Sequence, residues 1–184
     1  MKVNIEAAKY SDAKRLIEIY KPYVLDTAIT FEYEVPGVEE FQKRIINTLI
    51  NYPYLVAKIE DKIVGYAYTS SFKSRSAYIW AVETSIYVDK DYHGMKIGKL
   101  LYEELEKISK KQNILNMNAC ISMPDMGSVS FHKKMGYKQV AFFHQCGYKL
   151  NRWYDMIWME KMIGEHKLNP QAFIPFSKLD YHFG

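Results

Sequence analysis

The feature that most constrains this chain is a strand that runs through a glycine-containing loop straight into a helix, over residues 84–102. Apolar and polar side chains alternate over residues 85–88, which predicts the strand, and the loop holds Gly94 and Gly98. Glycine lets a backbone approach a ligand closely, and the free N–H groups at a helix start attract phosphate. The segment therefore predicts a pyrophosphate seat between the strand and the helix.

Two well-known phosphate-binding patterns do not fit this loop. A P-loop has four residues between its first glycine and the following Gly-Lys-Ser/Thr, whereas only Met-Lys-Ile separates Gly94 from Gly98. A Rossmann fingerprint has G-x-G-x-x-G near the start of a parallel sheet, whereas these glycines lie at mid-chain with a different spacing. A third pattern, Gln/Arg-x-x-Gly-x-Gly/Ala, resembles residues 93–98, except that His93 replaces Gln/Arg and Lys96 replaces the first glycine. That pattern is the coenzyme A loop of the GNAT superfamily of N-acetyltransferases.

The resemblance extends well beyond the loop. Residues 73–83 resemble one GNAT subfamily, the phosphinothricin acetyltransferases and their methionine-sulfoximine-acetylating relatives, as do residues 52–57, 147–149 and 153–155. The similar segments follow the same order over residues 3–162. The resemblance implies an acetyl-CoA-dependent N-acetyltransferase and a homodimer, for which the aromatic side chains of Trp153, Tyr154 and Trp158 offer apolar contact surface.

Hydrophobic periodicity places the elements along the chain. Strands are expected at 2–7, 54–59, 62–72, 81–89, 114–122, 137–145 and 153–161, and helices after residue 12, from residue 38, from the glycine loop to about 111 and at 127–135. The order β-α-α-β-β-β-α-β-α-β-β is that of the GNAT fold, which implies an α/β (α+β) domain with a mixed, mostly antiparallel central sheet flanked by helices. Ser11 or Asp12 is expected to cap the first helix, Pro22 to split or kink it, and Gly136 to end the last one.

Composition limits the other possibilities. The 184 residues suit one domain, expected at 1–163, followed by an extended arm at 164–184. The formal charge of +4 is small and scattered, which argues against nucleic-acid binding and suits an anionic small molecule. Cys120 and Cys146 have no metal-ligand spacing, so we expect free thiols and no metal. An N-terminus without an apolar signal region and the lack of a long apolar run predict a cytoplasmic protein that does not span a membrane.

Two residues are the catalytic candidates. Acetyl transfer to an amine requires removal of a proton from the amine, and a proton can assist departure of the thiolate. Glu83 begins the strand that leads to the loop and matches the carboxylate used as base in the resembling subfamily. His132 lies four residues before Gly136, where the same subfamily also has a histidine, and it is the candidate acid. The alternatives are a solvated strand glutamate and a surface histidine.

The candidate contacts to acetyl-CoA lie on the strand, the loop and the start of the later helix. They are Ser85, Ile86, Tyr87, Val88, His93, Gly94, Met95, Lys96, Ile97, Gly98, Lys99, Asp125 and Ser128. Asp125 stands where the family usually has an asparagine, and an ionised carboxylate cannot donate the hydrogen bond that an amide donates. Lys96 is either a pyrophosphate contact or a solvated loop lysine.

A cluster of cations precedes the strand that carries Glu83. Lys73, Arg75 and Tyr78 could hold the acidic groups of a small amine substrate, and Phe31 could wall the same pocket. The sequence thus favours direct transfer in a ternary complex to the α-amine of an amino acid analogue of the phosphinothricin or methionine sulfoximine/sulfone type. The alternatives are another amine, such as a protein N-terminus or a polyamine, and a non-catalytic acyl-CoA-binding module.

Overall fold

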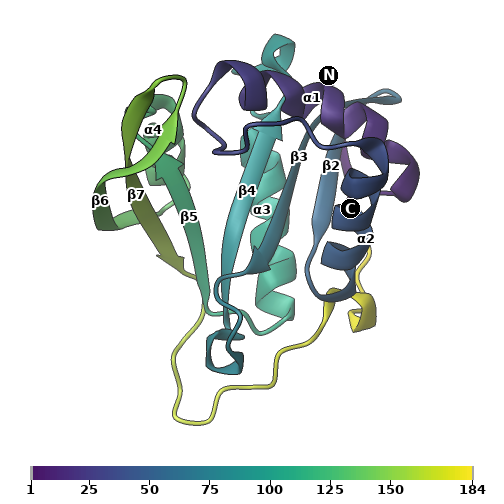
Figure 1. Ribbon diagram of the computed structural model, residues 1–184. Helices are drawn as coiled ribbons and strands as arrows, with labels where there is room; N and C mark the ends of the chain where they lie inside the picture. Colours follow the sequence, from purple (N-terminus) through teal and green to yellow (C-terminus); the bar gives the residue numbers. More distant parts are fainter. Residues whose placement is uncertain (1, 184) are drawn as a thin grey trace.

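A single seven-stranded sheet forms the centre of the computed structural model, which describes residues 2–183 (Figure 1). The strands are β1 Val3–Ala7, β2 Tyr54–Ile59, β3 Lys62–Ser71, β4 Ala81–Val88, β5 Asn116–Ser122, β6 Lys138–Lys149 and β7 Arg152–Met162. They lie in the order β1-β2-β3-β4-β5-β7-β6, and β4 with β5 is the one parallel pair among neighbours that are otherwise antiparallel. The mixed, mostly antiparallel sheet expected from the sequence is confirmed.

Helices cover both faces of the sheet. They are α1 Ala13–Asp26, α2 Val38–Asn51, α3 Ile97–Lys111 and α4 Met126–Lys134, with short 3-10 turns η1 Tyr10–Asp12, η2 Ser76–Tyr78, η3 Lys90–Tyr92 and η4 Phe176–Lys178. Strand alternation divides the core in two. In β2, Tyr54 and Val56 face a cluster with α1 and α2, whereas Leu55 and Ala57 face a cluster with α3.

The two halves of the sheet meet over a very short junction. Only residues 81–83 of β4 pair with 116–118 of β5, and beyond this point β4 keeps β3 as its partner on one side alone. Beyond residue 83 the other edge of β4 therefore has no strand partner, and its backbone groups must bond to side chains, water or a ligand. The strands separate toward the end where the loop before α3 lies (Figure 1).

Several local predictions were wrong, each for a physical reason. Pro22 does not split α1, because buried side chains on both sides of it hold the helix to the sheet while Pro22 itself is exposed; a kink at Pro22 stays a prediction. Asp12 occupies the N-cap position of α1 without capping it, because its carboxylate accepts the N–H of Lys9 at 2.7 Å instead. The strand expected at 137–145 runs to Lys149, since a register shift between Phe143 and Gly147 absorbs an irregular stretch without ending the pairing.

The C-terminal segment lies on the domain and does not form a strand. After β7 it passes the start of β4, where the Trp80 indole N–H donates to the Gln171 carbonyl at 2.7 Å. It then pairs with the end of α3, because Gln112 exchanges hydrogen bonds with Ile174 in both directions. The division of the chain at residue 163 stays a prediction.

Candidate active site

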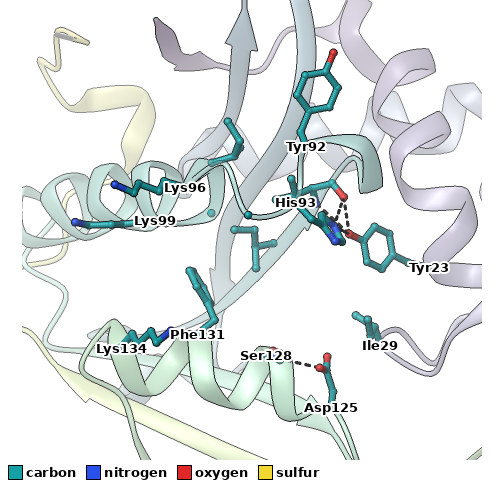
Figure 2. Close-up of a pocket in the computed structure, with 16 residues that line it drawn as sticks. Tyr23, Ile29, Tyr92, His93, Lys96, Lys99, Asp125, Ser128, Phe131 and Lys134 are labelled. Atoms are coloured by element: carbon teal, nitrogen blue, oxygen red, sulfur yellow. Dashed lines mark hydrogen bonds between the residues drawn. The ribbon is translucent and has the colours of Figure 1, made fainter. Parts of the chain in front are cut away.

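A cleft of about 650 Å³ opens where β4 and β5 separate (Figure 2). Its lining comes from the end of β4, the loop before α3 and the first turn of that helix, α4, and residues of α1 and the loop after it. The lining residues are Tyr23, Ile29, Ile86, Val88, Tyr92, His93, Gly94, Lys96, Ile97, Gly98, Lys99, Asp125, Gly127, Ser128, Phe131 and Lys134. Most of the loop and helix residues predicted from the sequence are thus brought together in one place.

The start of α3 is built to attract an anion. No side chain caps this helix end, and no acidic residue lies in its first turn, so its leading N–H groups are free. Lys96 and Lys99 lie at this same end, next to the positive pole of the helix dipole, where a cation is unfavourable. A bound phosphate would satisfy the N–H groups and offset the repulsion between the lysines and the helix.

The two glycines of the loop are required for different physical reasons. Gly94 has a φ of +78° and Lys96 a φ of +63°, so the lysine takes a left-handed conformation that glycine adopts more easily. Gly98 is required by space, since a Cβ there would lie 3.2 Å from Ile86 Cδ1 and 3.3 Å from a ring carbon of Phe131. Gly98, Ile86 and Phe131 all line the cleft, so a side chain at position 98 would narrow the cleft.

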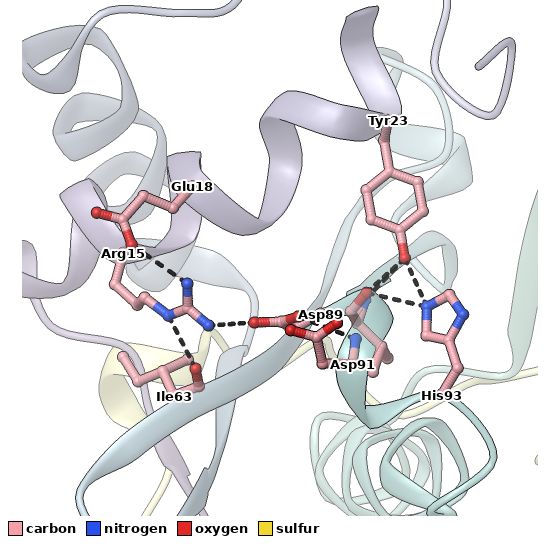
Figure 3. Close-up of polar contacts among 8 residues, drawn as sticks. Arg15, Glu18, Tyr23, Ile63, Asp89, Asp91 and His93 are labelled. Atoms are coloured by element: carbon pink, nitrogen blue, oxygen red, sulfur yellow. Dashed lines mark hydrogen bonds and ion pairs between the residues drawn. The ribbon is translucent and has the colours of Figure 1, made fainter. Parts of the chain in front are cut away.

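Tyr23 and His93 close over the free edge of β4. The Tyr23 hydroxyl donates to the Val88 carbonyl and accepts the Val88 N–H at 3.3 Å, and His93 Nε2 lies 3.1 Å from both the hydroxyl and that carbonyl (Figure 3). The Val88 backbone therefore points toward the cleft. Because peptide directions alternate along a strand, the N–H and C=O of Ile86 point the same way.

An ion pair also holds α1 against the beginning of the loop that follows β4. Arg15 of α1 donates to Asp89, which directly follows β4, and its Nε donates to the Ile63 carbonyl at 3.0 Å (Figure 3). Burial alone would raise the pKa of Asp89, but hydrogen bonds from Arg15 and from the Asp91 N–H lower it below its ordinary value. The pair therefore holds the beginning of the loop against the helix.

Glu83 lies on the face of β4 that carries Ser85 and Tyr87, opposite to the face of Ile86 and Val88. It is half-buried, and burial raises the pKa of its carboxyl while the nearby charge of Lys73 opposes the rise. The Lys73 ammonium lies 4.9 Å from the ring centroid of Phe72 and 5.6 Å from that of Trp158. The lysine is thus held over two aromatic rings, near enough for its charge to act on the Glu83 carboxyl.

The other predicted substrate contacts are Phe31, Tyr78 and Arg75. Phe31 packs in the loop between α1 and α2, with its ring 6.1 Å from that of Tyr154 on β7. Tyr78 lies in η2 with its ring 6.1 Å from that of Phe72, and it is 42% exposed. Arg75 directly precedes η2 and is exposed, so it could reach an acidic group of a substrate only from solvent.

His132 lies in the core, behind the cleft. It is 3% exposed, its Nδ1 lies 2.8 Å from the Ser128 carbonyl, and its Nε2 lies 2.9 Å from the Tyr102 hydroxyl. Burial lowers the pKa of the imidazole, although the bond to Ser128 and the charge of Asp125 oppose this. The Ser128 hydroxyl, 3.4 Å from Nδ1, connects it to the cleft. The general-acid role of His132 stays a prediction.

Asp125 serves as the N-cap of α4. Its Oδ1 accepts the Ser128 N–H at 2.9 Å, so the first turn of α4 is capped whereas that of α3 is not. The anionic cap disfavours phosphate at the N-terminal end of α4. Lys134, in the last turn of α4, places a positive charge at the opposite end of the helix. The phosphate end of a ligand therefore belongs at the α3 side.

Three predicted contacts, Ser85, Tyr87 and Met95, are described by the structure but do not line the cleft. Ser85 and Tyr87 face the Glu83 side, where the Tyr87 ring packs 4.7 Å from Tyr20 and 5.2 Å from Tyr23, and Met95 is 40% exposed. The prediction missed other lining residues, above all Tyr23, Ile29, Phe131 and Lys134. Phe131 and Lys134 follow Ser128 at intervals of three residues, so helical spacing from Ser128 could have found them, whereas Tyr23 and Ile29 come from a distant part of the chain.

Comparison with known proteins places this architecture in one family. The model of the acetyltransferase (GNAT) domain matches residues 5–158. Phosphinothricin N-acetyltransferase of Streptomyces viridochromogenes is 30% identical over 84% of this chain and 84% of its own length. L-methionine sulfoximine/L-methionine sulfone acetyltransferase of Salmonella typhimurium is 27% identical over 89% and 96%.

Solved structures agree. A GNAT superfamily phosphinothricin acetyltransferase from Sinorhizobium meliloti, in complex with acetyl-CoA, superposes with a TM-score of 0.90 and 31% identity over 97% of this chain and 98% of that one. The chain therefore belongs to the GNAT acetyltransferase family and is an N-acetyltransferase of it. The resemblance found in the sequence is confirmed. No helix within residues 2–183 is long and apolar enough to cross a membrane.

Proposed function

We propose that the protein transfers the acetyl group of acetyl-CoA to the α-amine of a small amino acid analogue, of the phosphinothricin or methionine sulfoximine/sulfone type. The uncapped, lysine-flanked start of α3 at the edge of β4, with Glu83 on the same strand, supports transfer from acetyl-CoA, and the relatives named phosphinothricin and methionine sulfoximine/sulfone acetyltransferases support the amine class. The pyrophosphate of acetyl-CoA would lie on the N–H groups of Ile97, Gly98 and Lys99. The pantetheine arm would follow the edge of β4.

The reaction then runs as direct transfer in a ternary complex. The amine nitrogen attacks the thioester carbon and its proton passes to Glu83 directly or through water, which gives a tetrahedral oxyanion. The carbon–sulfur bond breaks when this oxyanion collapses to the amide. The open N–H of Ile86 is positioned to stabilise the oxyanion, and the thiolate leaves with a proton from solvent or through Ser128. A raised pKa suits Glu83 to this task, since it makes the carboxylate a stronger base.

An acyl-enzyme route is less well supported. Burial raises the pKa of the Cys120 thiol to about 12, with the charge of Glu83 adding to the effect, so Cys120 stays a thiol and a poor nucleophile. Cys146 is exposed on β6, and its thiol lies 4.0 Å from the Tyr154 carbonyl. Both cysteines are free, as is usual in a reducing compartment, and we propose that the reaction takes place in the cytoplasm.

A panel of amines assayed for thiol release from acetyl-CoA tests the proposal. Phosphinothricin, methionine sulfoximine and methionine sulfone should be acetylated with a higher kcat/KM than spermidine or peptide N-termini. Faster acetylation of polyamines or peptides would reject the substrate class. An absence of thiol release with every amine, in a protein that still binds acetyl-CoA, would favour a non-catalytic binding module.

We also propose a homodimer that uses the surface of β6 and the β6–β7 turn. β6 is an edge strand of 12 residues, and side chains on it and beside it are apolar and exposed: Val140, Phe142, Phe143, Tyr148, Leu150 and Trp153. Of the aromatic residues predicted for this role, Trp153 is 60% exposed, whereas Tyr154 is 5% exposed and Trp158 packs within the chain. Sedimentation at micromolar concentration should give twice the chain mass, and Phe142→Lys should give the monomer mass. A monomer in the unmodified protein rejects the dimer.

A further inference from the structure

Lys149 is a buried charge that the proposed reaction does not use. It is the last residue of β6, it is 3% exposed, and its ammonium donates to the Thr30 carbonyl at 2.6 Å. Thr30 belongs to the loop between α1 and α2, 119 residues earlier in the chain. Lys149 therefore ties the first half of the sheet to the second, across the region where β4 and β5 separate.

The neighbours of Lys149 fasten the same loop. At Gly147 a Cβ would lie 2.4 Å from the Phe31 ring, so the ring rests on bare backbone that only glycine provides. The Tyr33 hydroxyl donates to the Tyr148 carbonyl. Three consecutive residues at the end of β6 thus hold residues 30–33, and Phe31 lies at the centre of these contacts.

Stability alone does not explain a lysine at this position. Burial lowers the pKa of the ammonium, and the charge of Glu32 opposes this only in part. An ammonium removed from water is costly unless its donors are satisfied, and an apolar side chain of similar size often replaces such a group without loss of stability. What an apolar side chain cannot supply is a hydrogen bond to the Thr30 carbonyl, which fixes the position of the loop backbone.

We propose that Lys149 is a positioning residue: by holding the Thr30 carbonyl it sets the place of Phe31, and thereby the wall of the site that receives the amine. The inference rests on the proposed function, because Phe31 is assigned to the amine side of that site. Loss of Lys149 should loosen this wall and weaken amine binding. The seat at the start of α3 does not depend on this contact, so acetyl-CoA binding should change less.

The test compares Lys149→Met with Lys58→Met. Lys58 is also a partly buried lysine on a strand and donates to Glu6 at 2.5 Å, but it lies on β2 away from the loop. Lys149→Met should raise the amine KM about tenfold, the effect of losing one charged hydrogen bond, and change the acetyl-CoA KM less than about threefold. Lys58→Met should leave both KM values unchanged.

A double-mutant cycle asks whether Lys149 acts through Phe31. Phe31→Ala combined with Lys149→Met should be no worse for the amine KM than Phe31→Ala alone, because the wall is already lost. Additive effects in this cycle would overturn the proposed route. So would an amine KM in Lys149→Met equal to that of the unmodified protein, even where the melting temperature falls.

Hydrogen exchange separates this inference from the proposed reaction, because it needs no substrate. The amides of residues 29–33 should exchange faster in Lys149→Met than in Lys58→Met or the unmodified protein. Unchanged exchange there overturns the inference whatever the enzyme acetylates, whereas faster exchange in a protein that acetylates no amine overturns only the proposed function. Should Lys149→Met fail to fold, Tyr33→Phe removes the second fastening and should shift the same amides and the amine KM in the same direction.

Discussion

At the scale of single residues, the environment of Glu83 determines how the enzyme should respond to pH. Burial raises the pKa of this carboxyl and Lys73 partly opposes the rise. A base must be ionised to act, so the acidic limb of the kcat profile should lie above the ordinary glutamate value of about 4.3. Lys73→Met removes the opposing charge and should move this limb to still higher pH.

Glu83→Gln removes the proposed base itself. The amide cannot accept a proton, so kcat should fall by roughly 10²- to 10⁴-fold and the acidic limb should disappear, while acetyl-CoA still binds. The measurement is kcat against pH in the unmodified protein and both variants, with the acetyl-CoA dissociation constant as the control. A limb that persists unchanged in Glu83→Gln would mean that another group removes the proton.

Lys96 combines a strained backbone with a useful charge. Its φ of +63° costs an L-residue about 1–2 kcal/mol, which glycine would avoid, although glycine also gains entropy in the unfolded chain. Lys96→Gly should therefore leave the melting temperature unchanged or slightly higher, and raise the acetyl-CoA KM up to about fivefold through loss of an exposed charge. Lys96→Met keeps the backbone strain and loses the charge. It should therefore raise the acetyl-CoA KM as much as Lys96→Gly does, but have a lower melting temperature than Lys96→Gly. An acetyl-CoA KM that neither variant changes would place the lysine in solvent.

At the scale of elements, the start of α3 should determine cofactor affinity. Gly98→Val would push a branched side chain toward Ile86 and Phe131, which already lie 3.2–3.3 Å from the position of a Cβ. We expect the acetyl-CoA KM to rise by at least tenfold while the amine KM stays within about threefold, because the amine approaches from the Glu83 face. Circular dichroism would show that the variant is folded. A folded variant with unchanged acetyl-CoA KM contradicts the cofactor site.

The helices and strands also show which parts of the fold can be predicted from the sequence. Local signals placed the β2–β3 hairpin, the end of α3 and the glycine loop correctly, because each depends on neighbours in the chain. The end of α4 was equally clear, since Gly136 has a φ of +91° directly after the C-cap of the helix. The periodicity of β7 could not indicate that it lies between β5 and β6, because the order of strands is set by contacts between distant segments.

The candidate site divides in the same way. Loop residues such as His93 and Gly98 were found because they follow one another in a pattern, whereas Tyr23, whose hydroxyl reaches the Val88 backbone, comes from a distant part of the chain. His132 matched a pattern as well, yet it is buried with both ring nitrogens engaged. Spacing therefore identified which segments meet, and only the fold determined which side chains reach the cleft.

At the scale of the whole molecule, the C-terminal segment completes the core on the α3 side. The apolar side chains that it contributes to this cluster are Phe173, Phe176, Leu179, Tyr181 and Phe183. Its contacts run from the start of β4 at Trp80, past the end of α3 at Gln112, to Glu104, which accepts from the Tyr181 hydroxyl. The segment thus braces the outside of the short β4–β5 junction on which the cleft depends.

Phe173 should account for a measurable part of that bracing. Its ring lies 5.6 Å from that of Tyr52 and is packed against the core, whereas Leu168 in the same segment is 100% exposed. Phe173→Ala should lower the free energy of unfolding by about 1–3 kcal/mol, because it removes a partly buried aromatic side chain, and Leu168→Ala should change it by less than about 0.5 kcal/mol. Urea unfolding of both variants measures the difference. Equal stabilities would mean that the segment lies on the domain without supporting it, and the cleft would then owe its shape to the sheet and helices alone.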